Sequence, residues 1–332
     1  MKKTNLIIFV CLILVSILII VSIIWKPKTP VVPANNSQNN NNNSLNTSQN
    51  NASKVFLSKY PIIFVHGWMG KAVDFAPYGL KLKEDGIAEY KGTLTKYDNQ
   101  SICPEQWPKA VSVSAEYYYY FNKDNGIENY SLELEPIINL VKECTGSDEV
   151  IIIAHSMGGL VSRKYMADYG NSSVKKLITL ATPHYGFNQF TRSEIVFMMI
   201  EVFTSRAHEV DQMKPGSEFL KELDDADIDY RSQVVSIGTY NIANATNRTV
   251  LFGLRVAPSQ VQDFEKQHFD NTDIVVSLDS TKLAGCKYYQ VEGCSHTEIT
   301  DFRSSYPKGP INNANTCTDA YEIVKNEILD AS

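Results

Sequence analysis

The sequence has no excess of positive charge. Its 332 residues include 31 Lys and Arg against 37 Asp and Glu, and its formal net charge is −6 at pH 7. A nucleic-acid-binding chain would be expected to carry a basic patch, so we expect no nucleic-acid partner. The sequence also has no internal repeat. Its length and 43% hydrophobic content suit one sizeable α/β core and are too small for two large ones.

Charge is absent altogether from Leu6–Trp25, which follows a short basic terminus, residues 1–5. Twenty helical residues span about 30 Å, the thickness of a bilayer's hydrocarbon core. A cleaved signal peptide usually has a shorter apolar region and ends in small residues, and no clear A-x-A site is present here. We therefore expect an uncleaved transmembrane signal-anchor, with a removed signal peptide as the alternative. Two lysines flank each end, so charge barely decides the orientation.

Residues 26–54 contain few apolar side chains and are rich in Asn and Ser, with prolines at the start. Such a stretch cannot bury apolar surface, so we expect a disordered linker. It would separate a folded domain, residues 55–332, from a membrane. We expect this domain to be extracytoplasmic, either membrane-anchored or secreted, and we predict no obligate protein partner.

Cysteine is scarce, with six in the chain, of which Cys11 lies in the apolar segment. The other five are Cys103, Cys144, Cys286, Cys294 and Cys317. This number suits one or two disulfides in an oxidising compartment. Our first expectation is a Cys103–Cys144 bond and our second is Cys286–Cys317. Because five is odd, one thiol stays free or pairs elsewhere.

From residue 55 onward, short apolar strands alternate with amphipathic helices. The predicted strands are Pro61–Val65, Val111–Tyr119, Glu149–Ala154, Lys176–Ala181, Gln233–Gly238 and Cys286–Val291. The predicted helices are Leu132–Cys144, Met157–Tyr169, Ser193–Phe203, Glu218–Asp224 and Ala320–Leu329. This alternation predicts an α/β fold, with a mostly parallel sheet and helices on both faces. Ligands of such sheets bind beyond the carboxyl ends of the strands.

One predicted strand, Glu149–Ala154, runs directly into a serine and then into a helix. A strand, a sharp turn at Ser156 and a helix form a nucleophile elbow, which needs small residues two before and two after the serine. Ala154 and Gly158 meet this need, with alanine in place of the first glycine of G-x-S-x-G. The alternative is a serine that caps a helix.

A second buried strand ends in His66-Gly67. Acyl transfer requires two preorganised backbone donors for the oxyanion. We expect these donors to be the N–H of Met157, which follows the serine, and the N–H of Trp68, with Met69 as a fallback. His66 itself is predicted to be a structural hydrogen-bonding residue and not a base.

The serine needs a base, and imidazole suits that role near neutral pH. His296 lies just past a strand, in a Gly/Ser loop near the end of the chain, and is the predicted base. Asp273 precedes an apolar pair and is the predicted carboxylate partner, with Asp270 and Asp279 as alternatives. The chain order Ser156, Asp273, His296 is the order of α/β-hydrolases.

On these residues the chain resembles the α/β-hydrolases of the lipase/esterase group over roughly residues 58–330. The resemblance is carried by "FVHGWMG", "IIIAHSMGGLVSRKYM", "LITLATPHYG", "MKPGSEFLKEL", "NTDIVVSLDS" and "VEGCSHTEI". It implies hydrolysis of carboxylic esters, including lipids, through an acyl-serine, without a metal or an organic cofactor. A thioesterase, an amide hydrolase or a lipid acyltransferase could use the same site. An inactive membrane-tethered binding module is the alternative from another class.

Residues 187–229 lie where members of this group insert a cap or lid. The segment contains an apolar stretch with Phe197, Met198 and Met199. Flexible methionines adapt to varied acyl chains, so these three residues are candidates for substrate binding. Ordinary core packing is the alternative.

Overall fold

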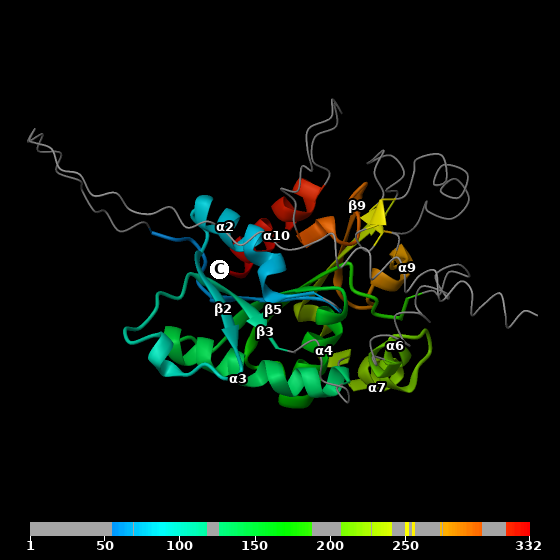
Figure 1. The fold of residues 1–332 in the computed structure, drawn as a ribbon, viewed down its shortest axis with the longest axis horizontal. Coiled ribbons are helices and arrows are strands. Elements are labelled where there is room, and N and C mark those ends of the chain that lie inside the picture. Colours follow the sequence, from blue (N-terminus) through cyan, green and yellow to red (C-terminus); the bar gives the residue numbers. More distant parts are fainter. Residues whose placement is uncertain are drawn as a thin grey trace, which may run out of the picture. The chain divides into compact units, whose positions relative to one another are not determined.

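A seven-stranded parallel sheet forms the centre of the part of the chain that the computed structural model describes (Figure 1). These residues belong to one unit, Ser53–Ser332. The described ranges are 55–68, 70–117, 126–187, 207–226, 228–240, 250–251, 254–255, 273, 275–300 and 317–332.

The strands of this sheet follow the order β2-β3-β1-β4-β5-β6-β9. Their bounds are β1 Ile62–Val65, β2 Glu89–Thr95, β3 Val111–Glu116, β4 Val150–His155, β5 Val174–Leu180, β6 Val234–Tyr240 and β9 Lys287–Glu292. A separate antiparallel pair consists of β7 Val250–Leu251 and β8 Leu254–Arg255. Strands β1 and β4 lie next to each other at the centre, where all four residues of β1 are buried. This burial on both faces explains their unbroken runs of β-branched and aromatic residues.

Helices cover both faces of the sheet (Figure 1). The α-helices are α2 Ala76–Glu84, α3 Ile127–Thr145, α4 Met157–Tyr169, α6 Ala207–Gln212, α7 Glu218–Ala226, α9 Leu278–Thr281 and α10 Cys317–Ala331. The 3₁₀ turns are η1 Ala72–Phe75, η2 Gln100–Ile102, η3 Ile228–Gln233 and η5 Glu298–Thr300. Helices α3 and α4 pack on one face, and α2 and α10 on the other.

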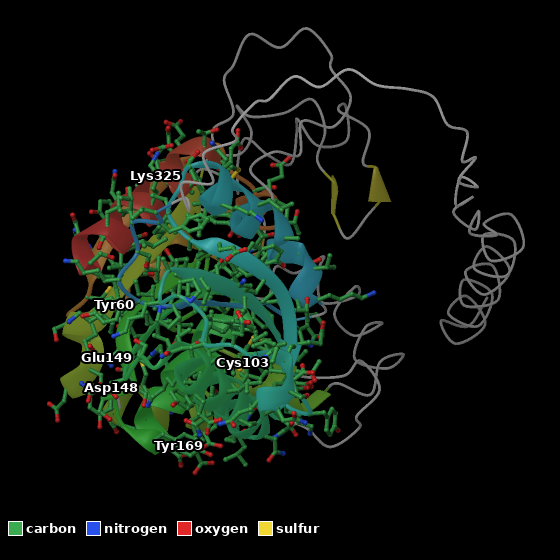
Figure 2. The ribbon with its side chains drawn as sticks, turned by 90° about the vertical axis from the view of Figure 1, so that its left-hand side faces the viewer. Tyr60, Cys103, Asp148, Glu149, Tyr169 and Lys325 are labelled. Carbon is green, nitrogen blue, oxygen red and sulfur yellow. A yellow bond between two sulfur atoms is a disulfide. The ribbon has the colours of Figure 1, made fainter. Side chains whose placement is uncertain are left out.

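Alternate residues of the central strands divide between two apolar clusters. Ile63 and Ile152 contribute to the cluster under α3 and α4, whereas Phe64 and Ile153 contribute to the cluster under α2 and α10. Figure 2 shows this layering from the side, with Tyr169 of α4 and Lys325 of α10 on opposite sides of the sheet. The predicted α/β-hydrolase fold, with a parallel sheet between helical layers, is therefore confirmed.

One disulfide expectation is confirmed and the other is wrong. Cys103 and Cys144 are bonded, with Cα atoms 5.8 Å apart. Cys317 is bonded to Cys294, at a Cα separation of 5.0 Å, and Cys286 is a free thiol. The reason is the direction of β9, which begins after Cys286 and ends just before Cys294. A six-residue strand is about 20 Å long, so the start of α10 lies near only one end of it.

The predicted membrane anchor, Leu6–Trp25, and the predicted linker lie outside the described residues. Within the described ranges, no helix is both long enough and apolar enough to cross a membrane.

Candidate active site

Ser156 stands in the sharp turn between β4 and α4. Its backbone has φ 54° and ψ −129°, a conformation that residues with a side chain rarely adopt. Such strain costs on the order of 1–3 kcal/mol and must be held by its surroundings. The N–H of Ser156 donates to the carbonyl of Leu180 at 2.9 Å, and the Ser156 carbonyl accepts from Gly159 at 3.0 Å. The backbone between β4 and α4 therefore forms the sharp turn that the predicted elbow requires.

Two glycines allow the close packing around this turn. A Cβ on Gly158 would lie 2.3 Å from the His66 carbonyl oxygen, and one on Gly67 would lie 2.8 Å from the Cβ of Ser156. Neither distance leaves room for a methyl group. The loop after β1 therefore lies directly against the serine and the start of α4.

The side chains of Ser156, His296 and Asp273 form one hydrogen-bonded chain. His296 Nε2 lies 2.9 Å from Ser156 Oγ, and His296 Nδ1 lies 2.8 Å from Asp273 Oδ2. Asp273 is fully buried, while Ser156 and His296 are each 8% exposed. When Nδ1–H donates to the carboxylate, Nε2 presents a lone pair to the serine hydroxyl. This arrangement can remove a proton from the serine.

Asp273 receives further donors. Its Oδ1 accepts the N–H groups of Val275 at 3.0 Å and Val276 at 2.7 Å, and its Oδ2 accepts the hydroxyl of Thr239 at 3.3 Å. Four donors on two oxygens suit a buried carboxylate, which is acceptor-only. Thr239 belongs to β6, so these contacts hold Asp273 beside the carboxyl end of that strand.

The alternatives to Asp273 are placed differently. Asp279 is an exposed residue of α9, and Asp270 lies outside the described residues.

His184 is fully buried, with its Nδ1 3.3 Å from Arg163 and its Nε2 3.1 Å from the Thr179 hydroxyl. Burial holds the pKa of His184 well below 6.5, which fits a neutral ring in the core.

Met157 directly follows Ser156, and Trp68 directly follows a glycine that packs against Ser156. Met157 is the first residue of α4, and the first N–H groups of a helix have no acceptor within it. Trp68 follows Gly67, which packs against the serine, and its side chain is half-buried. The two predicted donors thus belong to the two segments that pack around Ser156, the start of α4 and the loop after β1. Met69, the fallback donor, lies outside the described residues, as do Phe197, Met198 and Met199 of the predicted lid.

Sequence reasoning gave no role to His155 or Glu116. The His155 Nε2 lies 2.8 Å from the carbonyl oxygen of His296, and Glu116 Oε1 lies 3.3 Å from His66 Nε2. The predicted strand Val111–Tyr119 runs past Glu116, whereas β3 ends at this residue. The contact of Glu116 with His66 follows from the pairing of β1 with β3, which the local sequence does not give.

Comparison with known proteins gives a consistent picture. Residues 56–213 match the PGAP1-like alpha/beta domain family. The chain is 27% identical over 178 residues to a triacylglycerol lipase of Pseudarthrobacter phenanthrenivorans, a match that covers 47% of this chain and 48% of the relative. The match to a triacylglycerol lipase of Burkholderia plantarii has the same identity and covers 42% of that relative. The chain thus aligns with somewhat less than half the length of these relatives.

Among solved structures, the chain is similar to phospholipase PlaB from Legionella pneumophila. The TM-score is 0.51 at 13% identity, over 82% of this chain and 64% of that one. At this identity the similarity concerns the fold, which is the one described above.

Proposed function

We propose that the chain is an α/β-hydrolase of the lipase/esterase group and that it hydrolyses carboxylic esters of lipids through an acyl-serine intermediate. The observation that carries this proposal is the continuous chain of contacts from Ser156 through His296 to Asp273, at 2.9 Å and 2.8 Å. The names of the two relatives, both triacylglycerol lipases, support a lipid as the source of the ester.

The proposed reaction begins when Ser156 Oγ attacks the ester carbonyl carbon and its proton passes to His296 Nε2. Asp273 stabilises the imidazolium that forms. The negative charge on the former carbonyl oxygen is received by the backbone N–H groups of Trp68 and Met157. His296 then gives its proton to the leaving alcohol. A water molecule, deprotonated by the same ring, hydrolyses the acyl-serine and restores the hydroxyl.

Replacement of the serine is the first test. We expect Ser156→Ala to reduce ester turnover by about four to six orders of magnitude, because no nucleophile remains. The measurement is kcat on p-nitrophenyl esters of graded acyl length, with labelling by a fluorophosphonate probe located by mass spectrometry. Wild type should label at Ser156.

The control is Ser101→Ala, which changes an exposed serine of η2 and should leave labelling and turnover unchanged. Retained ester turnover in Ser156→Ala would overturn the proposed nucleophile. Wild type that neither labels nor turns over any ester would overturn the proposed activity. The dependence on acyl length then separates a lipase from an esterase of short chains.

We also propose that Leu6–Trp25 anchors the catalytic domain at a membrane, with the domain on the extracytoplasmic side. The support is the uncharged twenty-residue run, together with the Cys103–Cys144 and Cys294–Cys317 disulfides. Disulfides persist in oxidising compartments and are rare in the cytosol, which favours export of the domain.

A further inference from the structure

The loop from His66 to Lys71 connects β1 to η1 and contains Trp68, one of the two proposed oxyanion donors. Its second residue, Gly67, packs directly on Ser156. Stabilisation of an oxyanion depends steeply on donor distance, and a misplacement of about 1 Å can cost about 100-fold in rate. Whatever holds this loop in place therefore affects the reaction.

Glu116, the last residue of β3, contacts both ends of this loop. Its Oε1 lies 3.3 Å from Nε2 of His66, the first loop residue. Its Oε2 accepts the backbone N–H of Ala72, the first residue after the loop, at 3.0 Å. The register of β1 and β3 explains this position, because Val65 pairs with Ala115, and so His66 and Glu116 leave the sheet at the same edge. One carboxylate thus bridges the two ends of the loop.

The His66 side chain is itself fixed. It is 1% exposed, and its ring stacks on that of Tyr117 at a centroid distance of 4.5 Å. The Tyr117 hydroxyl donates to the His66 carbonyl at 2.6 Å, and His66 Nδ1 lies 3.0 Å from the carbonyl oxygen of Gly67. An Nδ1–H donated to Gly67 leaves Nε2 facing the Glu116 carboxylate.

The electrostatics of Glu116 agree with this arrangement. Burial raises the pKa of its carboxyl, but the hydrogen bonds from His66 and from the Ala72 N–H, with the nearby charge of Lys71, outweigh burial and lower it. Asp74, the other acid on this side of the loop, accepts the N–H of Lys71 at 2.8 Å. Glu116 is therefore a charged acceptor for both ends of the loop at neutral pH.

We propose that Glu116 is a positioning residue, whose carboxylate holds the 66–72 loop, through His66 and Ala72, in the conformation that presents the Trp68 N–H to the oxyanion. This inference rests on the proposed ester hydrolysis. The mechanical part, that Glu116 fixes the loop, can be measured without any substrate.

The test compares Glu116→Ala and Glu116→Gln with wild type. Alanine removes both contacts, and we expect kcat to fall about 10- to 100-fold, with KM changed less than about threefold, because one oxyanion donor is misplaced. Glutamine can accept the Ala72 N–H with its oxygen and place its amide N–H groups toward His66 Nε2. It should therefore keep kcat within about fivefold of wild type. This rescue distinguishes positioning from general damage to the fold.

Glu133→Ala is the matched control, since Glu133 is also 22% exposed and paired, with Lys96, away from Ser156. It should leave kcat unchanged. Hydrogen exchange provides the second readout: Glu116→Ala should speed exchange at the amides of residues 67–72 at least tenfold, and Glu133→Ala should not.

Wild-type kcat in Glu116→Ala, or a glutamine variant as slow as the alanine variant, would overturn the proposal. Unchanged exchange in the loop would overturn it even if wild type proved inactive on esters. An inactive wild type with faster loop exchange in Glu116→Ala would instead count against the proposed function alone.

Discussion

His155 lies against both the loop after β1, at Gly67, and the loop that carries His296. It precedes Ser156, and its Nε2 lies 2.8 Å from the carbonyl oxygen of His296. Its other ring nitrogen lies beside Gly67, where an added Cβ would be 3.1 Å from Nδ1. Burial, together with any positive charge on His296, holds the pKa of His155 well below 6.5. The ring is therefore neutral, and the Nε2–H tautomer can donate to the His296 carbonyl.

Replacement of this donor should affect catalysis more than folding. We expect His155→Phe, which keeps an aromatic ring but leaves the His296 carbonyl without this donor, to lower kcat on the order of tenfold, since a buried lost hydrogen bond costs about 1–3 kcal/mol. His155→Gln can place an amide N–H near the same point and should be closer to wild type. Steady-state kinetics on a short-chain ester measures both variants.

A pH titration of stability provides the check on this reading. The folded-state pKa is lowered, so the unfolded chain binds a proton first, and the free energy of unfolding should fall as pH drops below about 6.5. His155→Gln removes this titrating group and should make the fall shallower. Equal kcat in the phenylalanine variant and wild type would show that the bond to His296 has no role in the reaction.

At the scale of the elements, a disulfide ties the base to the last helix. Cys294 ends the turn after β9, two residues before His296, and Cys317 is the first residue of α10. Both sulfur-bearing residues are buried, at 0% and 6% exposure. The bond therefore restricts the loop that carries His296 against a helix whose inner face packs on the sheet.

The two disulfides give a matched pair of variants. We expect Cys294→Ala/Cys317→Ala to lower kcat about tenfold, because the His296 loop loses its attachment. The Cys103–Cys144 bond joins the segment before β3 to the end of α3. Its removal in Cys103→Ala/Cys144→Ala should leave kcat at the wild-type value. Each should lower the free energy of unfolding by about 2–4 kcal/mol. Similar kcat losses in both variants, measured well below their unfolding temperatures, would contradict a special role for the Cys294 bond.

The same elements explain which parts of the fold were predictable. Strands β1 and β4 are buried on both faces, so an unbroken apolar run identified them. Helix α4 begins at Met157 as predicted, because the serine and glycines mark the turn. Strand β2 was missed because it is an edge strand of mixed burial, with the polar sequence Glu89–Thr95.

The site was predictable only where local sequence carries the chemistry. Ser156, Asp273 and His296 follow strands or stand in small-residue turns, and the structure brings them within hydrogen-bonding distance. Glu116 and the carbonyl contact of His155 depend on strand register and loop packing, which no local pattern encodes. The Cys286 expectation failed for a related reason, since sequence spacing does not give the direction of a strand.

At the scale of the whole molecule, the proposed anchor and the catalytic domain should be separable. We expect the full chain to sediment with membranes, to resist extraction by high salt and to be released by detergent, because about 20 buried apolar residues hold it there. A variant that lacks residues 1–54 should remain in the supernatant. Its kcat on a water-soluble ester should equal that of the detergent-released full chain.

Fractionation of expressing cells, followed by probe labelling, measures both quantities. Full chain in the supernatant at its complete length would contradict the anchor, whereas a shortened mature chain would indicate a removed signal peptide. A truncated variant that pellets with membranes would show that the domain binds lipid by itself.

The site is assembled from groups far apart in sequence: the contact between Ser156 and His296 spans 140 residues, and β9, the strand before His296, pairs with β6 at one edge of the sheet. A nascent chain that has emerged only through α4 carries a serine without its base. Under the proposed mechanism, such a chain has no group that could activate the serine. The site is complete only when β9 is paired with β6 and the loop after β9 has placed His296 beside Ser156.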